Sequence, residues 1–180
     1  MSYTEIFKID KAGDVYNVYD IKNSWRGAIK IWAILEKKYL PPYEPEWAKY
    51  MQMDTKVGRF CDFTNKEALQ EIWDLFKNKQ VSLTDKIVLG TTFDHVIVFK
   101  KDFQAVITAF ENFEGETSLP EQAHILKALQ DSSSCIGVAW NQTSVNAGAW
   151  RINSPETGES VCYNIFKQNN HWDLFADLHI

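Results

Sequence analysis

The segment from Trp140 to Arg151 combines side chains that could bind a small molecule or a protein partner. Its candidate residues are two indoles, short polar groups and one guanidinium: Trp140, Asn141, Gln142, Ser144, Asn146, Trp150 and Arg151. An indole offers a flat apolar surface, whereas amides donate and accept hydrogen bonds. These polar types are also ordinary loop residues that bond their own backbone, and a purely structural role is the alternative explanation. We expect Trp140 to reach the core from a central strand, with its ring partly covered by Trp150.

A cysteine-dependent reaction is a second chemistry that the residues could support, because a thiolate beside a histidine is a nucleophile. Cys162, His171 and Asp173 form the most suggestive set, since a final hairpin over 161–167 and 172–178 would bring them side by side. No local motif of a cysteine protease or transferase accompanies them. A free cysteine in an apolar strand is usually a small buried hydrophobe. We therefore rank a cysteine-dependent enzyme third among the functions.

Other catalytic patterns are missing from the sequence. The four histidines are scattered, and neither Cys-x-x-Cys nor His-x-x-x-His occurs, so we expect no metal site. Glycine-rich phosphate loops and Gly-x-Ser-x-Gly are absent too, and we expect no cofactor. The carboxylates around one loop have polar neighbours, which favours a solvated rim over a catalytic pair; they are Glu111, Glu114, Glu116 and Glu121.

Aromatic and sulfur side chains gather in an irregular segment after the double proline at 41–42. They are Tyr43, Trp47, Tyr50, Met51 and Met53. Trp, Tyr and Met are enriched at the centres of protein interfaces, so the segment could be a contact surface. The alternative is that these side chains cover the sheet or a helix as part of the core.

The elements that must position these residues are organised around the stretch 86–113. Short β-branched runs at 87–89 and 96–99, separated by turn residues 90–94, predict a hairpin. A helix should follow Asp102, with one apolar stripe formed by Phe103, Val106, Ile107, Phe110 and Phe113. This pattern of hairpin and amphipathic helix is typical of an α+β domain.

The other expected elements complete that picture. We expect an N-terminal hairpin over 3–9 and 15–21, and three further main helices over 24–40, 64–76 and 118–130. A short helix is expected over 44–53. Strands are expected over 57–63, 135–140 and 150–152, in addition to the final hairpin. Capping boxes start two of the helices, at Thr64 with Glu67 and at Ser118 with Glu121. The sequence predicts one α+β domain over residues 1–180, with a largely antiparallel sheet of hairpins covered by about four helices.

Composition and charge limit the possible partners. The chain has 180 residues, 45% hydrophobic content and a formal net charge of -5, which suits one globular domain. Residues 101–180 carry four basic against ten acidic side chains, which disfavours nucleic acid and favours a basic protein surface as partner. Three cysteines and no apolar leader favour a cytoplasmic protein with reduced, mostly buried thiols. No apolar run approaches the length of a membrane span.

We therefore expect a small acidic, cytoplasmic, non-enzymatic protein that binds another protein, as an accessory, inhibitor or immunity-type factor. The alternative is a small-ligand-binding domain that uses the segment 140–151. The sequence indicates neither a nucleic-acid nor a membrane partner, and it leaves the oligomeric state open.

Overall fold

The computed structural model describes residues 2–51, 57–143 and 148–178. Five strands form one sheet in the order β2-β1-β4-β3-β7. Their bounds are Tyr3–Asp10 for β1, Val15–Lys22 for β2, Val96–Phe99 for β3, Cys135–Gln142 for β4 and Trp172–Asp173 for β7. All neighbouring pairs are antiparallel except β3 and β7, which run parallel. A separate two-stranded sheet pairs β5 (Arg151–Asn153) with β6 (Ser160–Cys162).

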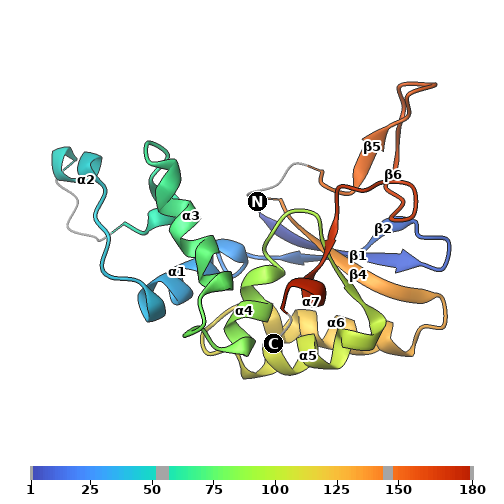
Figure 1. The fold of residues 1–180 in the computed structure, drawn as a ribbon, viewed down its shortest axis with the longest axis horizontal. Helices are drawn as coiled ribbons and strands as arrows, with labels where there is room; N and C mark the ends of the chain where they lie inside the picture. Colours follow the sequence, from blue (N-terminus) through green and yellow to red (C-terminus); the bar gives the residue numbers. More distant parts are fainter. Residues whose placement is uncertain (1, 52–56, 144–147, 179–180) are drawn as a thin grey trace.

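Seven α-helices lie within the described ranges. They are α1 (Ala28–Tyr39), α2 (Glu46–Tyr50), α3 (Lys66–Asp74), α4 (Leu83–Gly90), α5 (Phe103–Asn112), α6 (Leu119–Asp131) and α7 (Leu174–Asp177). Short 3-10 turns cover Arg59–Cys61, Leu75–Lys77 and Lys100–Asp102. Figure 1 shows α4, α5 and α6 below the large sheet, β5 and β6 above it, and α1, α2 and α3 extending to the left.

The sheet separates two apolar cores because successive side chains of a strand point to opposite faces. The larger core lies between the sheet and the helices, and it contains Ile6, Val138 and Trp140. The smaller core lies on the other face, where Trp150 and Tyr163 pack against the sheet. The predicted α5 stripe is fully inside: Phe103, Val106, Ile107, Phe110 and Phe113 are all buried, which confirms the helix and its inward face.

The structure confirms a mixed helix and sheet fold with a mostly antiparallel sheet, and it confirms the N-terminal hairpin β1–β2. The predicted hairpin at 87–99 is wrong, because residues 83–90 form helix α4 and only 96–99 form a strand. The Ser82 hydroxyl accepts a hydrogen bond from the Asp85 N–H and starts the helix. A short run that is buried on every side has no periodicity that would distinguish a helix from a strand.

Three other details differ from the sequence prediction. About four main helices and one short helix were expected, and the described ranges contain seven. The two additional helices, α4 and α7, lie where strands were predicted. The final hairpin is wrong as well: β6 pairs with β5, whereas β7 pairs with β3. The expected strand at 57–63 is a 3-10 turn over Arg59–Cys61. The boundary of one domain at 1–180 stays a prediction.

Helix starts also differ in detail from the predicted capping boxes. Asn65, one residue after Thr64, caps α3 by accepting from the Glu67 N–H. Ser118 stands at the start of α6, and there its side chain makes no capping hydrogen bond.

Among the described residues, no helix has the length and apolar character needed to cross a bilayer.

Candidate functional site

The two indoles of the predicted binding segment lie on opposite faces of the sheet. Trp140 belongs to the larger core, where its Nε1 donates to Gln122 Oε1 over 3.1 Å and its ring meets the edge of Phe110. Trp150 belongs to the smaller core, and its Nε1 donates to the Trp140 carbonyl over 2.8 Å. Trp140 therefore reaches the core as expected, but the expected cover of its ring by Trp150 is wrong.

The amides of the same segment bond to the protein itself. Asn141 and Gln142 are the last residues of β4 rather than loop residues. Gln142 Oε1 accepts from the Thr4 hydroxyl over 2.7 Å, and Asn141 Nδ2 donates to Glu5 Oε2 over 2.6 Å. The buried Oδ1 of Asn141 has no hydrogen-bond partner among the described residues.

The remaining candidate residues of that segment are Ser144, Asn146 and Arg151. Arg151 is exposed in β5, whereas Ser144 and Asn146 lie outside the described residues. Trp140, Asn141 and Gln142 are thus part of strand β4, and their side chains form hydrogen bonds with other residues of the protein. A ligand-binding role of the segment stays a prediction.

The cysteine set is not assembled as predicted, because no hairpin joins β6 to β7. Cys162 is exposed in β6 and Cys61 is only partly buried, so the expectation that most thiols are buried is wrong. His171 instead shares a hydrogen bond of 2.7 Å between its Nδ1 and the Tyr163 hydroxyl. Burial and then the nearby His95 lower the pKa of His171. Among the described residues, no group of three or more His, Cys, Asp or Glu could hold a metal ion.

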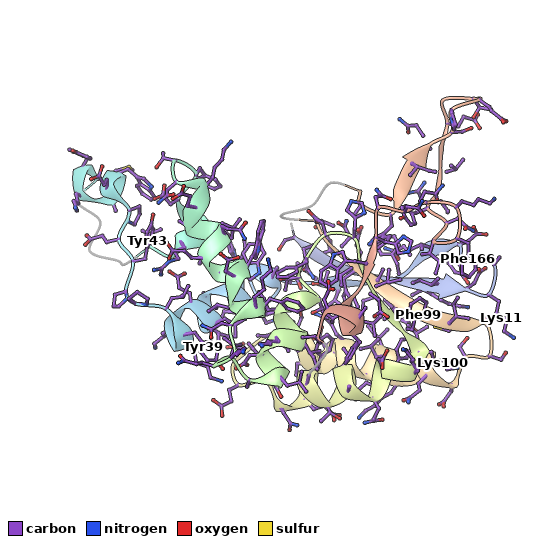
Figure 2. All side chains as sticks on the ribbon, viewed as in Figure 1. Lys11, Tyr39, Tyr43, Phe99, Lys100 and Phe166 are labelled. Carbon is purple, nitrogen blue, oxygen red and sulfur yellow. The ribbon has the colours of Figure 1, made fainter. Side chains whose placement is uncertain are left out.

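The irregular aromatic segment divides into an internal part and an exposed part. Tyr43, labelled in Figure 2, donates through its hydroxyl to Asp62, and the Trp47 indole donates to the same carboxylate. Hydrogen bonds from Thr64 and then Tyr43 lower the pKa of Asp62 to about 2. Tyr50 and Met51 are 86% and 65% exposed, and the predicted Met53 lies outside the described residues.

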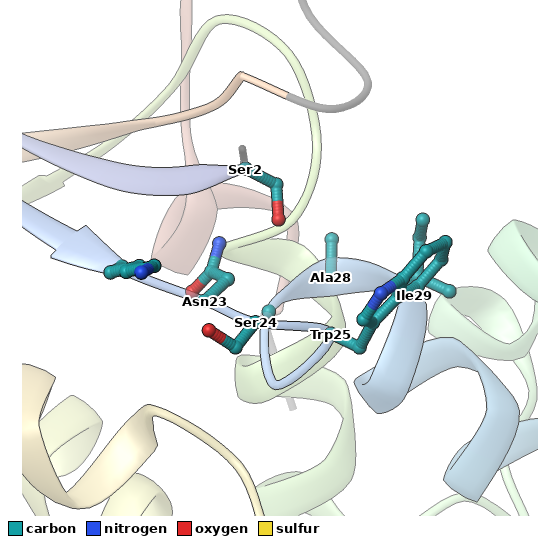
Figure 3. A pocket seen from close by; sticks show the side chains of 8 residues that line it. Ser2, Asn23, Ser24, Trp25, Ala28 and Ile29 are labelled. Carbon is teal, nitrogen blue, oxygen red and sulfur yellow. The ribbon is translucent and has the colours of Figure 1, made fainter.

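A hollow beside the start of α1 is one candidate site that the sequence did not suggest. It has about 600 Å³ and is lined by Ser2, by residues 22–25 and by residues 27–29. Figure 3 shows the side chains of Trp25 and Ile29 close together, with those of Asn23 and Ser24 apart from them. Ser24 and Trp25 both adopt positive φ angles, which are costly for residues other than glycine. The lining nevertheless comes almost entirely from one short segment.

A second candidate, which we call the aromatic groove, joins three distant segments of the chain. It consists of two hollows of about 540 and 600 Å³ that share Phe76, Lys77 and Phe93. The first hollow is also lined by Leu69, Gln70, Trp73, Asp74, Thr92 and Asp94. The second is also lined by Lys79, Lys86, Trp172, Asp177 and Leu178. Helix α3, the loop after α4 and the β7–α7 segment thereby meet at one surface.

Four aromatic rings form a continuous row along this groove. The centroid of Phe93 lies 6.1 Å from that of Trp73 and 5.6 Å from that of Phe76, both edge to face. Trp172 completes the row at 5.9 Å from Phe76 and 6.0 Å from Phe93. All four rings are only partly buried, although they pack against the larger core. Trp32, buried behind Trp73 at 6.3 Å, fixes the row to α1.

The polar and charged side chains that line the groove differ between its two ends. The buried Nε1 of Trp73 has no hydrogen-bond partner among the described residues. Asp74 and Asp94 line the first hollow, and burial raises the pKa of Asp94. Lys77 lines both hollows, while Lys79 and Lys86 line the second. One end of the groove is therefore rich in lysine.

The sequence pattern did not reveal this groove. Trp73 and Phe76 lie in the helix expected over 64–76, and Phe93 lies among the expected turn residues 90–94. Trp172 comes about eighty residues later, and only the parallel pairing of β7 with β3 brings it to the other rings. No local signal links these residues, because the site is created by tertiary structure.

No protein-family model matches the chain, and neither a curated protein nor a solved structure is significantly similar to it. The geometry of the site is therefore the basis on which a function can be inferred.

Proposed function

We propose that the protein acts by binding another protein, and that an apolar segment of this partner docks in the aromatic groove. Such a protein would serve as an accessory, inhibitor or immunity-type factor. The observation that carries the proposal is the row of four partly exposed rings formed by Trp73, Phe76, Phe93 and Trp172. Residence in the cytoplasm stays a prediction.

The chemistry of the row supports a protein partner. Aromatic residues are enriched in the centres of protein interfaces, where they gain the most from losing contact with water. Apolar surface that stays partly exposed and contiguous is a common mark of an interaction site. The four rings are held by one another and by Trp32, so binding costs little side-chain entropy.

The shape of the groove supports an extended segment rather than a compact ligand. Two hollows of about 540 and 600 Å³ adjoin at Phe76 and Phe93. A single drug-sized ligand typically fills one pocket of about 300–1,000 Å³. Two adjoining hollows can take spaced anchor side chains of one peptide, which is how grooves select such residues.

Selection from a random peptide library displayed on phage tests the proposal. Gln70 is exposed at the rim of the first hollow, so Gln70→Trp should obstruct the groove with little effect on folding. The matched control is Gln104→Trp, because Gln104 is also exposed on a helix and also bonds to the residue four positions later. We expect peptides with spaced aromatic or aliphatic residues that bind the wild type and Gln104→Trp but not Gln70→Trp. Enriched peptides that bind all three proteins equally would contradict the proposal.

A further inference from the structure

We propose that the segment that docks in the aromatic groove is acidic, with its carboxylates placed against Lys77, Lys79 and Lys86. This inference rests on the proposed function, and it specifies the chemistry of the partner. The juxtaposition that carries it is a cluster of lysines at one end of an aromatic row.

The three lysines come from three adjacent parts of the chain that line the same hollow. Lys77 ends the 3-10 turn after α3, Lys79 follows in the loop, and Lys86 lies in α4. All three line the second hollow together with Phe76 and Trp172. A cation beside an aromatic floor suits an occupant that presents both carboxylates and apolar side chains.

The charges of these lysines are not neutralised by close ion pairs. Among the described residues, none of the three takes part in a salt bridge, whereas Lys38 and Lys127 pair with carboxylates elsewhere. One carboxylate, that of Asp177, lines the same hollow against the three ammonium groups. The second hollow therefore keeps a surplus of positive charge in a protein whose formal net charge is -5.

The positive charge at the second hollow favours an acidic partner, whereas the net charge of the chain favoured a basic one. The acidic C-terminal half favoured a basic partner surface, but net charge describes the whole surface and not one site. At the second hollow, a basic segment would meet three lysines against one aspartate, and like charges placed together weaken binding. An acidic segment gains attraction at the second hollow, and its apolar anchor occupies the first.

Three synthetic peptides test the inference. They carry the same tryptophan and leucine anchors, and their spacer residues are glutamate, glutamine or lysine. Binding is measured by fluorescence anisotropy at low and high salt, because salt screens exposed charges. We expect the glutamate peptide to bind about tenfold tighter than the glutamine peptide at low salt, as several modest ion pairs would produce. The lysine peptide should bind weakest, and high salt should reduce all these differences.

Charge reversal provides the matched variants. The triple variant Lys77→Glu, Lys79→Glu and Lys86→Glu should invert the order, so that the lysine peptide binds tightest. The control triple replaces three exposed lysines outside the groove with glutamate and should keep the original order; these are Lys11, Lys30 and Lys167. Circular dichroism checks that both triples fold. If the groove triple does not fold, the double variant Lys77→Gln and Lys79→Gln should remove most of the preference for glutamate.

The outcomes separate this inference from the function on which it rests. Equal affinity for the three peptides, abolished by Gln70→Trp, would overturn the acidic partner and leave the groove as a docking site. Binding that Gln70→Trp does not reduce would contradict the docking site itself. An inverted order in the control triple would also overturn the inference, because total charge would then explain the preference.

Discussion

The indole N–H of Trp150 donates to the backbone carbonyl of Trp140 over 2.8 Å, although the two rings lie in different cores. Strand β3 pairs with β4 only as far as Ala139, so the indole supplies a donor just beyond the end of that ladder. This single hydrogen bond links the chain entering β5 to the middle of the fold.

Trp150→Phe should lower the free energy of unfolding by about 1–3 kcal/mol, because it leaves a buried carbonyl without its donor. The matched control is Trp25→Phe, since Trp25 is 74% exposed and its loss should cost less than about 0.5 kcal/mol. Urea unfolding followed by circular dichroism measures both. Equal losses in the two variants would show that the Trp150 bond contributes nothing to stability.

Arg59→Met should destabilise the protein by about 3–5 kcal/mol, because it leaves the buried Glu36 carboxylate without its cation. Arg59 is itself buried and lies 2.8 Å from Glu36. Glu71→Gln breaks the other ion pair of Arg59, but the Glu71 side chain is 49% exposed, so its loss should cost less than about 1 kcal/mol. The same urea experiment measures both variants, and a larger loss for Glu71→Gln would refute the assignment.

The carboxylate of Asp62 should contribute to acid unfolding. Its pKa is lowered from 3.8 to about 2 by hydrogen bonds from Thr64 and Tyr43, so the folded protein binds this proton less readily than the unfolded chain. The stability from Asp62 is therefore complete above about pH 4 and is lost as the pH falls from about 4 toward 2. Asp62→Asn should flatten the dependence of melting temperature on pH in that window. An unchanged slope would mean that other groups control it.

The three thiols should react with Ellman's reagent at different rates. Cys162 is exposed and should react first, whereas burial raises the pKa of Cys61 and of Cys135 and slows both. Cys135 is only 2% exposed and should need local unfolding before it reacts. Mass spectrometry of partly labelled protein gives the order. Labelling of Cys135 as fast as Cys162 would contradict the structure of β4.

Much of the fold was predictable wherever the sequence had a clear period. The α5 stripe repeats with helical spacing, and its five predicted residues are buried. The strand predicted at 87–89 is wrong because Ile87, Val88 and Leu89 are all buried, and such a run has no polar face that would indicate a helix. The strand β7 has only two residues and was misplaced because its partner, β3, is distant in the sequence.

The candidate site was less predictable than the fold. The segment 140–151 has the composition of a binding loop. Asn141 and Gln142 nevertheless form hydrogen bonds with side chains of β1, and no local sequence pattern predicts these bonds. The aromatic groove depends on three separate segments, and its residues resemble core and turn residues when they are read one segment at a time. A site of this kind becomes visible only when the tertiary structure is known.

Nuclear magnetic resonance of the indole N–H groups tests the docking site most directly. The protein has seven tryptophans, whose signals can be assigned by single Trp→Phe substitutions. On titration with the glutamate-spaced peptide, we expect saturable shifts of the signals of Trp73 and Trp172, which line the groove. The signals of Trp25, Trp140 and Trp150 should stay unchanged. Shifts confined to Trp25, or no saturable shift at Trp73 and Trp172, would contradict the aromatic groove as the binding site.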